Sequence, residues 1–253
     1  MQRLFSPAGE RAMREIIQRR PLLALDFDGT LAPIVSNPGD ARAPQEVSRL
    51  LTPLGSFFPV AIVTGRSVAD VSGRLGFNPR FIVGNHGAEG LPADGGLHAD
   101  ITPWRERILR DFKARLDAAG VQVEDKDYSL SLHYRQAHDP HAARDLIHAA
   151  IRSLEPAPRV IGGKFVVNLL PGNAPDKFDA VHSLLRISGC SSAIFAGDDV
   201  TDDIVFEKAP ADWLTVRVEA LPTSRARFML AEQGDVPRFL RRLLEIAGEV
   251  VTP

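Results

Sequence analysis

Residues 22–31 read Leu22-Leu23-Ala24-Leu25-Asp26-Phe27-Asp28-Gly29-Thr30-Leu31, an apolar run that ends in two carboxylates, a glycine and a hydroxyl. Such a run predicts a buried strand with polar residues at its C-terminal end. Because side chains two apart on a strand share a face, we expect Asp26 and Asp28 to converge on one point. Converging carboxylates repel each other unless a cation lies between them, which indicates Mg²⁺, an ion that prefers oxygen ligands. The alternative is a strand followed by an acidic turn, since Asp-Gly is a common turn signal.

The composition is that of an ordinary globular protein. The chain has 253 residues, 44% hydrophobic and 25% charged, which suffices for one large domain or two small ones. Its formal net charge of −2 gives no reason to expect a nucleic acid or an anionic membrane as partner. The single cysteine, Cys190, excludes an internal disulfide and fits a reducing compartment. We find no signal-peptide pattern in residues 1–20 and no apolar run near about 18 residues, so we expect a cytoplasmic protein.

Two further apolar runs also end in polar residues. Residues 59–63 are followed by Thr64-Gly65-Arg66-Ser67, and residues 81–83 by Gly84-Asn85-His86-Gly87-Ala88-Glu89. A hydroxyl after a buried strand, followed by glycine and a helix start, places Oγ and backbone N–H groups where an anion can bind. The alternatives are a helix capped by Ser67 and an ordinary structural histidine. Ligands bind at the carboxyl ends of strands in open α/β sheets, so three successive polar strand ends favour a site there.

The pattern changes between about residues 92 and 171 and predicts an inserted domain. We expect a helix over residues 103–119, strands over 121–124 and 128–134, a helix over 139–154, and strands over 159–161 and 164–169. The last two strands are joined through Gly162-Gly163, a favoured hairpin dipeptide. This order, helix-strand-strand repeated once, makes a four-stranded antiparallel sheet with helices on one face.

The alternation of strands and helices resumes after the insertion. We expect a helix over residues 177–187, a buried strand over 193–196, a last strand over 213–218 and a last helix over 236–246. The strand over 193–196 is followed by Gly197-Asp198-Asp199-Val200-Thr201-Asp202-Asp203, an acidic density that favours metal or substrate binding over a solvated turn. The fold class is therefore α/β, with a Rossmann-like core over residues 1–95 and 173–253 and an inserted α/β cap over residues 96–172.

Four of these features resemble, in order along the chain, the motifs of the haloacid dehalogenase superfamily. They are residues 26–31, Thr64, Lys177 and the acidic residues 197–202. Members of this superfamily are mostly phosphatases that pass through an aspartyl-phosphate.

The superfamily resemblance implies a division of roles among these side chains. Asp26 would attack phosphorus, and Asp28 would protonate the leaving oxygen and then activate water. Thr64 and Lys177 would hold the phosphoryl oxygens. The implied Mg²⁺ site would be formed by Asp26, Asp28, Asp198, Asp199 and Asp202.

Most of the chain, from about residue 22 to residue 244, resembles one family of that superfamily, the trehalose-6-phosphate phosphatases. The matching stretches are residues 64–67, residues 84–89, Glu124-x-Lys126 with residues 130–135, residues 197–202, and Ser224-x-Ala226-x-Phe228-x-Leu230. The resemblance implies Mg²⁺-dependent hydrolysis of trehalose 6-phosphate to trehalose and phosphate in trehalose biosynthesis. It also implies a functional link to trehalose-6-phosphate synthase.

The family resemblance further implies which side chains bind the sugar phosphate. Three neighbours in the loop after residue 83 would line the sugar side of the core site, and Arg66 would hold the substrate or the mouth of the site. Glu124 and Lys126 would reach the disaccharide hydroxyls when the cap closes; without the resemblance they would be an ordinary surface pair. Arg135 is included, although residues 133–135 equally fit cap core followed by an exposed arginine. The full set is Arg66, Asn85, His86, Gly87, Glu124, Lys126 and Arg135.

Three positions depart from the family pattern. Phe178 follows Lys177 where glycine is usual, so helix packing beside the lysine is expected to differ. Asn168 stands on the last cap strand where many relatives have an acidic residue, which affects one sugar contact. Asp203 stands where the family often has glutamate.

Other functions fit the same residues. The main rival is another capped sugar phosphatase, acting on sucrose 6-phosphate, mannosyl-3-phosphoglycerate or a hexose phosphate. A sugar-phosphate sensor is a second alternative, although a sensor has no need of the nucleophile Asp26. A phosphotransferase or mutase is a third, and it requires a second phosphoryl acceptor.

Overall fold

The computed structural model of the chain describes residues 1–91, 100–163 and 165–251. The chain forms two compact units, Met1–Leu91 with Pro175–Pro253, and Pro92–Ala174, called here the core unit and the cap unit. The boundary expected between residues 95 and 96 lies outside the described residues. Among the described helices, none combines the length and the apolar character that a membrane crossing requires.

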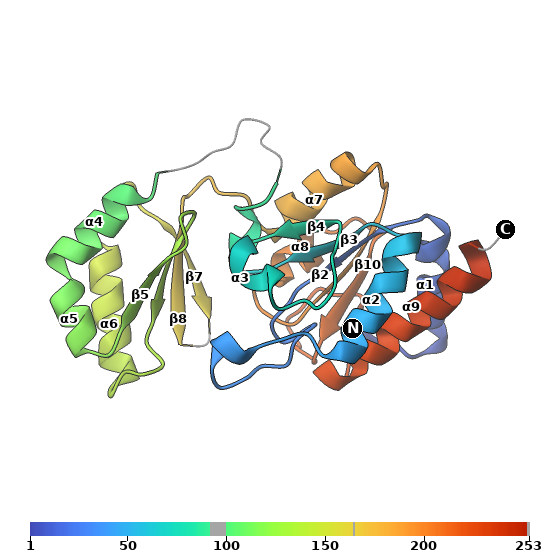
Figure 1. Ribbon diagram of the computed structural model, residues 1–253, viewed down its shortest axis with the longest axis horizontal. Coiled ribbons are helices and arrows are strands. Elements are labelled where there is room, and N and C mark those ends of the chain that lie inside the picture. Colours follow the sequence, from blue (N-terminus) through green and yellow to red (C-terminus); the bar gives the residue numbers. More distant parts are fainter. Residues whose placement is uncertain (92–99, 164, 252–253) are drawn as a thin grey trace. The chain divides into compact units, whose positions relative to one another are not determined.

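The core unit is built on one parallel sheet, whose strands follow the order β1-β11-β10-β9-β2-β3-β4 (Figure 1). Its central strands are short apolar runs that are buried on both faces, as parallel strands covered by helices usually are. The strands are β1 (Gln2–Arg3), β2 (Leu22–Leu25), β3 (Val60–Val63), β4 (Phe81–Val83), β9 (Ala193–Gly197), β10 (Leu214–Val218) and β11 (Phe228–Leu230).

The order of the strands places a topological switch point beside β2. The chain moves from β2 to β3 and β4 on one side, and later from β9 to β10 and β11 on the other side. β2 and β9 pair directly, with Leu25 opposite Ala196. Asp26 follows β2 and Asp198 follows β9, so both lie where open α/β sheets bind ligands.

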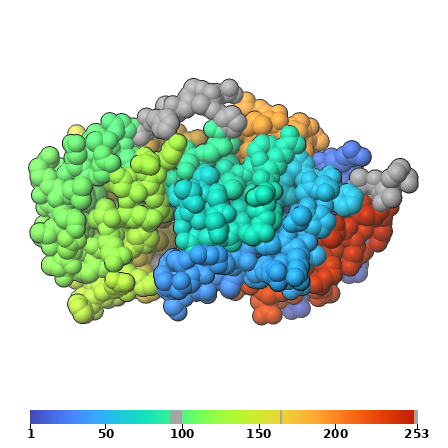
Figure 2. Space-filling model, in the orientation of Figure 1, coloured from blue at the N-terminus to red at the C-terminus, as the bar shows by residue number. Residues whose placement is uncertain are grey.

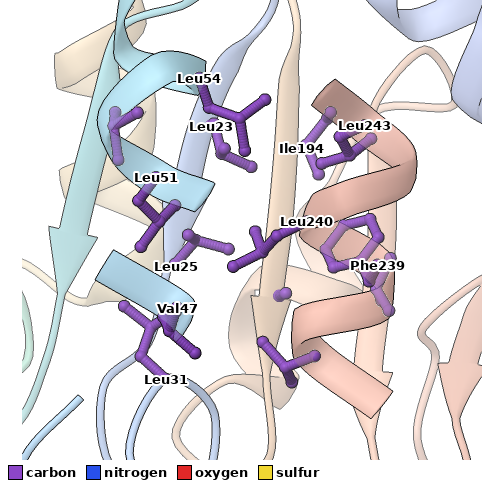
Figure 3. Close-up of a cluster of buried hydrophobic side chains, with 14 of the residues drawn as sticks. Leu23, Leu25, Leu31, Val47, Leu51, Leu54, Ile194, Phe239, Leu240 and Leu243 are labelled. Carbon is purple, nitrogen blue, oxygen red and sulfur yellow. The ribbon is translucent and has the colours of Figure 1, made fainter. Parts of the chain in front are cut away.

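Helices cover both faces of the core sheet. One face carries α1 (Pro7–Gln18), α2 (Gln45–Phe57) and α9 (Val236–Val251); the other carries α7 (Lys177–Ser188) and α8 (Asp203–Lys208). The short α3 (Val68–Ser72) follows β3. Figure 3 shows Leu51 of α2 and Leu240 of α9 among the side chains that pack over Leu25 and Ile194 of the strands. Truncation of such a buried leucine to alanine typically costs about 2–5 kcal/mol of stability.

The cap unit repeats helix-strand-strand, as expected, around an antiparallel sheet of order β5-β6-β8-β7. Trp104 and Ile108 of the first helix pack with Leu132 and Leu169 of the sheet in the cap core. The cap elements are α4 (Thr102–Asp111), α5 (Lys113–Ala118), β5 (Gln122–Asp125), β6 (Leu130–His133), α6 (Pro140–Ile151), β7 (Arg159–Gly163) and β8 (Val166–Leu170).

The structure differs from the sequence expectation at a few elements. Gly162 and Gly163 lie within β7, where Gly163 pairs with Val166, so the predicted turn at these glycines is wrong. Phe165, which directly precedes β8, has φ of 62° and so adopts a left-handed conformation. The helix expected over residues 103–119 is divided into α4 and α5 at Phe112, whose φ/ψ values are not helical. The α/β class and the inserted repeat are confirmed.

Candidate active site

A buried lysine and two buried aspartates form the centre of the candidate site. Nζ of Lys177 donates to Oδ1 of Asp26 at 2.9 Å and to Oδ1 of Asp202 at 2.7 Å. Asp26 is 4% exposed, Lys177 2% and Asp202 0%, so water hardly screens these ion pairs. The three residues are far apart along the chain, and the folded sheet brings them together.

The side chains of this centre are placed by rigid elements. Asp26 follows β2, and its backbone N–H donates to the carbonyl of Ala196 on β9 at 2.9 Å. Lys177 is the first residue of α7, whose start is closed by a capping box between Asp176 and Asp179. A capped helix start fixes the backbone of Lys177, and so it limits where the ammonium group can lie.

Two glycines make room for the carboxylates of the acidic loop, residues 198–203. Gly29 has φ of 78°, which other residues rarely adopt, and a Cβ there would lie 2.1 Å from Oδ2 of Asp198. A Cβ on Gly197 would lie 2.3 Å from Cγ of Asp202. Both positions therefore require glycine if Asp198 and Asp202 are to pack against the strand ends.

Three carboxylates at this edge of the core sheet lie close enough together to bind one metal ion. Asp26, Asp198 and Asp202 offer oxygen atoms that all lie within 4.8 Å of one another. Oγ1 of Thr30 donates to Oδ1 of Asp198 at 3.2 Å and helps to hold that carboxylate in the group. When all groups are ionised, the three carboxylates are balanced only in part by Lys177. A donor set of oxygens with an excess of negative charge fits a divalent cation such as Mg²⁺.

The ionisation of the group reflects the same excess of negative charge. Burial, reinforced by the carboxylate of Asp202, raises the pKa of Asp198 to about 7. Burial also raises the pKa of Asp26 and the pKa of Asp202. At Lys177 burial opposes the charged form, but the carboxylates of Asp202 and Asp26 outweigh it and raise the lysine pKa. A divalent cation would remove the electrostatic cost of ionising these carboxylates.

Asp28 is not one of the described residues that form this group. Its carboxylate accepts two hydrogen bonds from Arg66, from Nε to Oδ2 at 2.6 Å and from Nη2 to Oδ1 at 2.7 Å. The expectation that Asp26 and Asp28 belong to the strand is wrong, because β2 ends at Leu25. Their convergence on one point stays a prediction. Asp199 also lies outside the group, and its Oδ1 accepts from the backbone N–H that follows it at 2.7 Å.

The loops after β3 and β4 are hydrogen-bonded to each other. The N–H of His86 donates to the carbonyl of Thr64 at 2.9 Å, and the N–H of Asn85 donates to the carbonyl of Arg66 at 2.8 Å. The side chain of Asn85 donates to Oε2 of Glu89 at 2.8 Å, and this oxygen also accepts from the first N–H of α3 at 2.9 Å. The structure therefore brings Thr64, Asn85 and His86 together at the same edge of the sheet.

Gly87 lies against the backbone that leads into Lys177. Its φ is 118°, and a Cβ there would lie 2.4 Å from the carbonyl oxygen of Asp176. Any larger residue would have to displace Asp176, the residue that caps α7. Gly87 thus has a packing role beside the lysine, in addition to the substrate contact expected from the sequence.

Arg66 connects the site to the loop after β2. Its Nη1 donates to Oδ2 of Asp70 at 2.7 Å, and its Nη2 donates to the carbonyl of Pro38 at 2.9 Å. Arg74 continues the network, with Nε donating to Oδ1 of Asp70 at 2.9 Å and Nη1 to the carbonyl of Gly39 at 2.5 Å. Figure 2 shows the blue segment after β2 lying against the turquoise segment that contains α3.

The residues expected to bind sugar in the cap lie on or near its first hairpin. Oε2 of Glu124 lies 2.8 Å from Nε2 of His133 and 3.6 Å from Nζ of Lys126. The hydrogen bond from His133 lowers the pKa of Glu124. The register places Glu124 opposite Ser131, on the sheet face away from the hydrophobic cap core. Arg135 follows β6 and is exposed.

Comparison with known proteins gives the family to which these residues belong. The family model described as Trehalose-phosphatase matches residues 24–225. The chain belongs to the trehalose-phosphatase family. It is 34% identical over 205 residues to the trehalose-phosphate phosphatase of Mycobacterium avium (strain 104), covering 75% of this chain and 51% of that relative. The chain therefore spans about half the length of this relative.

Solved structures give the same result for the fold of this trehalose-phosphatase family member. A crystal structure of a trehalose-6-phosphate phosphatase related protein matches with a TM-score of 0.75 and 26% identity, covering 90% of this chain and 99% of that chain. The C-terminal domain of the C. albicans trehalose-6-phosphate phosphatase matches in fold, with a TM-score of 0.74 and 22% identity over 95% of this chain and 97% of that chain. The family and the fold class predicted from the sequence are confirmed.

The positions that depart from the trehalose-phosphatase pattern have identifiable surroundings. Phe178 stacks on Trp213, with ring centroids 5.8 Å apart, so the larger side chain packs beside the strand that follows α8. Oδ1 of Asn168 accepts from Ser131 at 2.7 Å, which uses the amide in a bond within the cap sheet. Asp203 accepts from Arg217 at 2.8 Å and from Ser224 at 2.7 Å.

Some residues that hold this trehalose-phosphatase site together were not found from the sequence. Arg217 on β10 is 5% exposed and donates to the carbonyl of Asp198 at 2.5 Å. Its signal was an arginine inside the apolar residues 214–218, since a buried guanidinium has to find buried acceptors. Asp70 gave no such signal, because charged residues are common at helix starts.

Proposed function

We propose that this chain is a Mg²⁺-dependent phosphatase that hydrolyses trehalose 6-phosphate to trehalose and inorganic phosphate. The observation that carries the proposal is the buried contact of Lys177 with Asp26 and Asp202, beside Asp198 at the switch point of the sheet. Membership of the trehalose-phosphatase family supports the choice of substrate. The substrate would be supplied by a trehalose-6-phosphate synthase, which gives the functional link expected from the sequence.

Asp26 is the proposed nucleophile. Its carboxylate attacks phosphorus, the bond between phosphorus and the sugar oxygen breaks, and an aspartyl-phosphate forms. Lys177 holds one oxygen of this carboxylate at 2.9 Å and so orients the nucleophile before the substrate arrives. The same ammonium group and Oγ1 of Thr64 would stabilise negative charge on the phosphoryl oxygens during the transfer.

Asp28 is the proposed acid and base. It gives a proton to the departing sugar oxygen, and it later takes a proton from the water that hydrolyses the aspartyl-phosphate. Because Arg66 holds the carboxylate of Asp28 through two hydrogen bonds, the exchange of this partner for the sugar oxygen belongs to the reaction cycle.

Asp26, Asp198 and Asp202 would hold the metal ion, since they form the group of converging carboxylates. A bound Mg²⁺ would supply positive charge that offsets the repulsion between these carboxylates and the phosphoryl oxygens. The assignment of Asp28 and Asp199 to the metal stays a prediction.

The two units of the chain support a division of labour. We propose that residues 1–95 and 173–253 are a phosphatase core and that residues 96–172 are a cap domain. The core would contribute Arg66, Asn85, His86 and Gly87 to sugar-phosphate binding, and the cap would contribute the charged residues of its first hairpin. The proposed cap contacts are Glu124, Lys126 and Arg135.

The test is phosphate release by the purified protein with Mg²⁺ and with EDTA. The substrates are trehalose 6-phosphate, sucrose 6-phosphate, mannosyl-3-phosphoglycerate and glucose 6-phosphate, and Asp26→Asn serves as the blank. Efficient turnover of trehalose 6-phosphate alone supports the proposal. Preference for another sugar phosphate contradicts the substrate assignment, whereas binding of trehalose 6-phosphate without turnover favours a sensor.

A further inference from the structure

A buried arginine lies directly beside the strand that leads into the acidic loop. Arg217 belongs to β10, where it pairs with Gly197, the last residue of β9. The other residues of β10 are apolar apart from Thr215, and the arginine is 5% exposed. Burial of a guanidinium is costly unless acceptors surround it, so its position requires partners in the structure.

The hydrogen bonds of Arg217 go to one segment, the acidic loop of residues 198–203. Nη2 donates to the carbonyl of Asp198 at 2.5 Å, and Nη1 donates to Oδ1 of Asp203 at 2.8 Å and to the carbonyl of Asp199 at 3.4 Å. Oγ of Ser224 donates to the same Oδ1 of Asp203 at 2.7 Å. Arg217 thus joins two backbone carbonyls to a carboxylate that Ser224 orients.

These bonds restrain the backbone from which the proposed metal ligands project. The bonds from Arg217 to the carbonyls of Asp198 and Asp199 restrict the rotation of the two peptide groups that follow the Cα of Asp198. They therefore also restrict the direction in which the Asp198 side chain projects. The N–H of Asp199 donates to Oδ2 of Asp202 at 2.9 Å, so the same restraint extends to the second carboxylate. Arg217 itself would not bind the metal ion, because the proposed ligands are the carboxylates of Asp26, Asp198 and Asp202.

Arginine has a geometry that suits this task better than lysine. Its planar guanidinium presents several N–H groups in a fixed fork and reaches acceptors in different directions, whereas an ammonium group is a point charge on a flexible stem. Partners of metal ligands that lie outside the coordination shell typically affect metal affinity by about 10- to 100-fold.

We propose that Arg217 is a positioning residue that sets the affinity of the Asp26, Asp198 and Asp202 group for Mg²⁺. The inference rests on the metal site of the proposed function. Arg217 acts through the acidic loop, and it acts before any substrate binds.

The experiment measures Mg²⁺ binding without substrate, by isothermal titration calorimetry and by the rise in Tm as MgCl₂ is added to metal-free protein. Arg217→Met should weaken Mg²⁺ binding by about 10- to 100-fold. Arg217→Lys keeps the charge and should give a smaller loss, so it carries the test if the methionine variant does not fold. Ser224→Ala, which removes one partner of Asp203, should weaken binding by less than about 10-fold, the smallest loss expected at Arg217.

A control arginine is available directly before the next strand, β11. Arg227 donates from Nη1 to the carbonyls of Ala211 and Trp213 at 2.8 and 3.0 Å, before β10 begins. Arg227→Met therefore loses side-chain bonds to backbone carbonyls at the other end of β10, and it should leave the Kd for Mg²⁺ unchanged.

The outcomes are distinguishable. A purely structural role would lower the Tm of the Arg217 variants in EDTA and leave their Kd for Mg²⁺ at the wild-type value, which would overturn the inference. If the wild-type protein binds no Mg²⁺, the metal site of the proposed function fails, and the inference fails with it. A Kd that rises at Arg217 and stays constant at Arg227 supports the inference, whatever sugar phosphate the protein hydrolyses.

Discussion

Arg66 and Asp28 form a bidentate ion pair, with Nε 2.6 Å from Oδ2 and Nη2 2.7 Å from Oδ1. The guanidinium also contacts Asp70 and lies 5.4 Å from the ring centroid of Phe27, so several neighbours fix its position. Such a pair fixes the orientation of the Asp28 carboxylate. In the proposed reaction, the carboxylate has to leave this arginine and take up a proton from water before it can donate that proton to the sugar oxygen.

Asp28→Asn tests the role of this carboxylate as acid and base. Turnover of trehalose 6-phosphate should fall by about 10²- to 10⁴-fold, because the sugar alkoxide is a poor leaving group without a proton. p-Nitrophenyl phosphate releases a stabler anion, so its turnover should fall much less. Rates of phosphate release and of nitrophenol release give the two values, and equal losses on both substrates would contradict the acid role.

Asp26→Asn should abolish turnover of both substrates, since an amide is not an effective nucleophile toward phosphorus. The protein should remain folded, because the substitution removes one of three clustered carboxylates whose charge Lys177 balances only in part. We therefore expect its Tm in EDTA to equal or exceed that of the wild type. Wild-type turnover in this variant would disprove the assignment of the nucleophile.

Asp70→Asn should reduce stability in a pH-dependent way. Although burial opposes the charged form, hydrogen bonds from Arg74 and Arg66 outweigh it and lower the pKa of Asp70 below 3.8. A lowered pKa stabilises the fold above the unfolded pKa of 3.8, and this stabilisation is lost as the pH falls through the folded value. At pH 7 we expect a loss of about 1 kcal/mol or less, because the side chain is partly exposed.

Urea unfolding of Asp70→Asn and wild type from pH 7 down to about pH 2.5 checks this expectation. The difference in free energy of unfolding should be constant at neutral pH and shrink only below pH 3.8. A difference that persists at the acidic end would show that the charge of Asp70 is not its cause.

Gly87→Ala should lower both Tm and turnover. The new Cβ would lie 2.4 Å from the carbonyl oxygen of Asp176, and φ of 118° is unfavourable for alanine. Strain of this kind either lowers the free energy of unfolding by about 1–3 kcal/mol or displaces the backbone that precedes Lys177. Gly73→Ala is the control, since φ of −75° suits alanine and nothing lies within 4 Å of its Cβ. Similar Tm and turnover in both variants would rule out the packing role of Gly87.

Lys126→Ala should impair turnover of trehalose 6-phosphate far more than that of p-nitrophenyl phosphate. The reason is that Lys126, which lies 3.6 Å from Glu124, is proposed to bind the disaccharide and not the phosphoryl group. Lys113→Ala on α5 removes a cap ammonium that pairs with Asp117 on its own helix, and it should have no effect. Comparable losses of kcat/KM on the two substrates would remove the specificity role of Lys126.

Much of the candidate site in the core unit was predictable because its polar side chains directly follow apolar strands. Asp26, Thr64 and Asp198 each follow a buried strand directly, so a parallel sheet necessarily brings them to one edge. Lys177 was found by its place at a helix start and by its family resemblance. The strands β1 and β11 were missed because runs of two and three residues carry no readable periodicity.

The directions of side chains were harder to predict than the order of elements. Asp26 and Asp28 lie outside the strand because it stops at Leu25, and the position of a strand end depends on pairing with its neighbours. The partners of Arg217 lie on a loop 14 to 19 residues earlier in the chain, so no local pattern identifies them. Gly162 and Gly163 show the same limit, since a glycine pair permits a turn without requiring one.

The chain enters α7 from the cap unit, and Lys177 is the first residue of that helix. Between this entry and the lysine stands Asp176, which exchanges hydrogen bonds with Asp179 and accepts from Lys208 of α8 at 2.8 Å. These bonds tie the start of α7 to its own first turn and to α8. The backbone that carries Lys177 is thus anchored within the core unit at the point where the chain enters it.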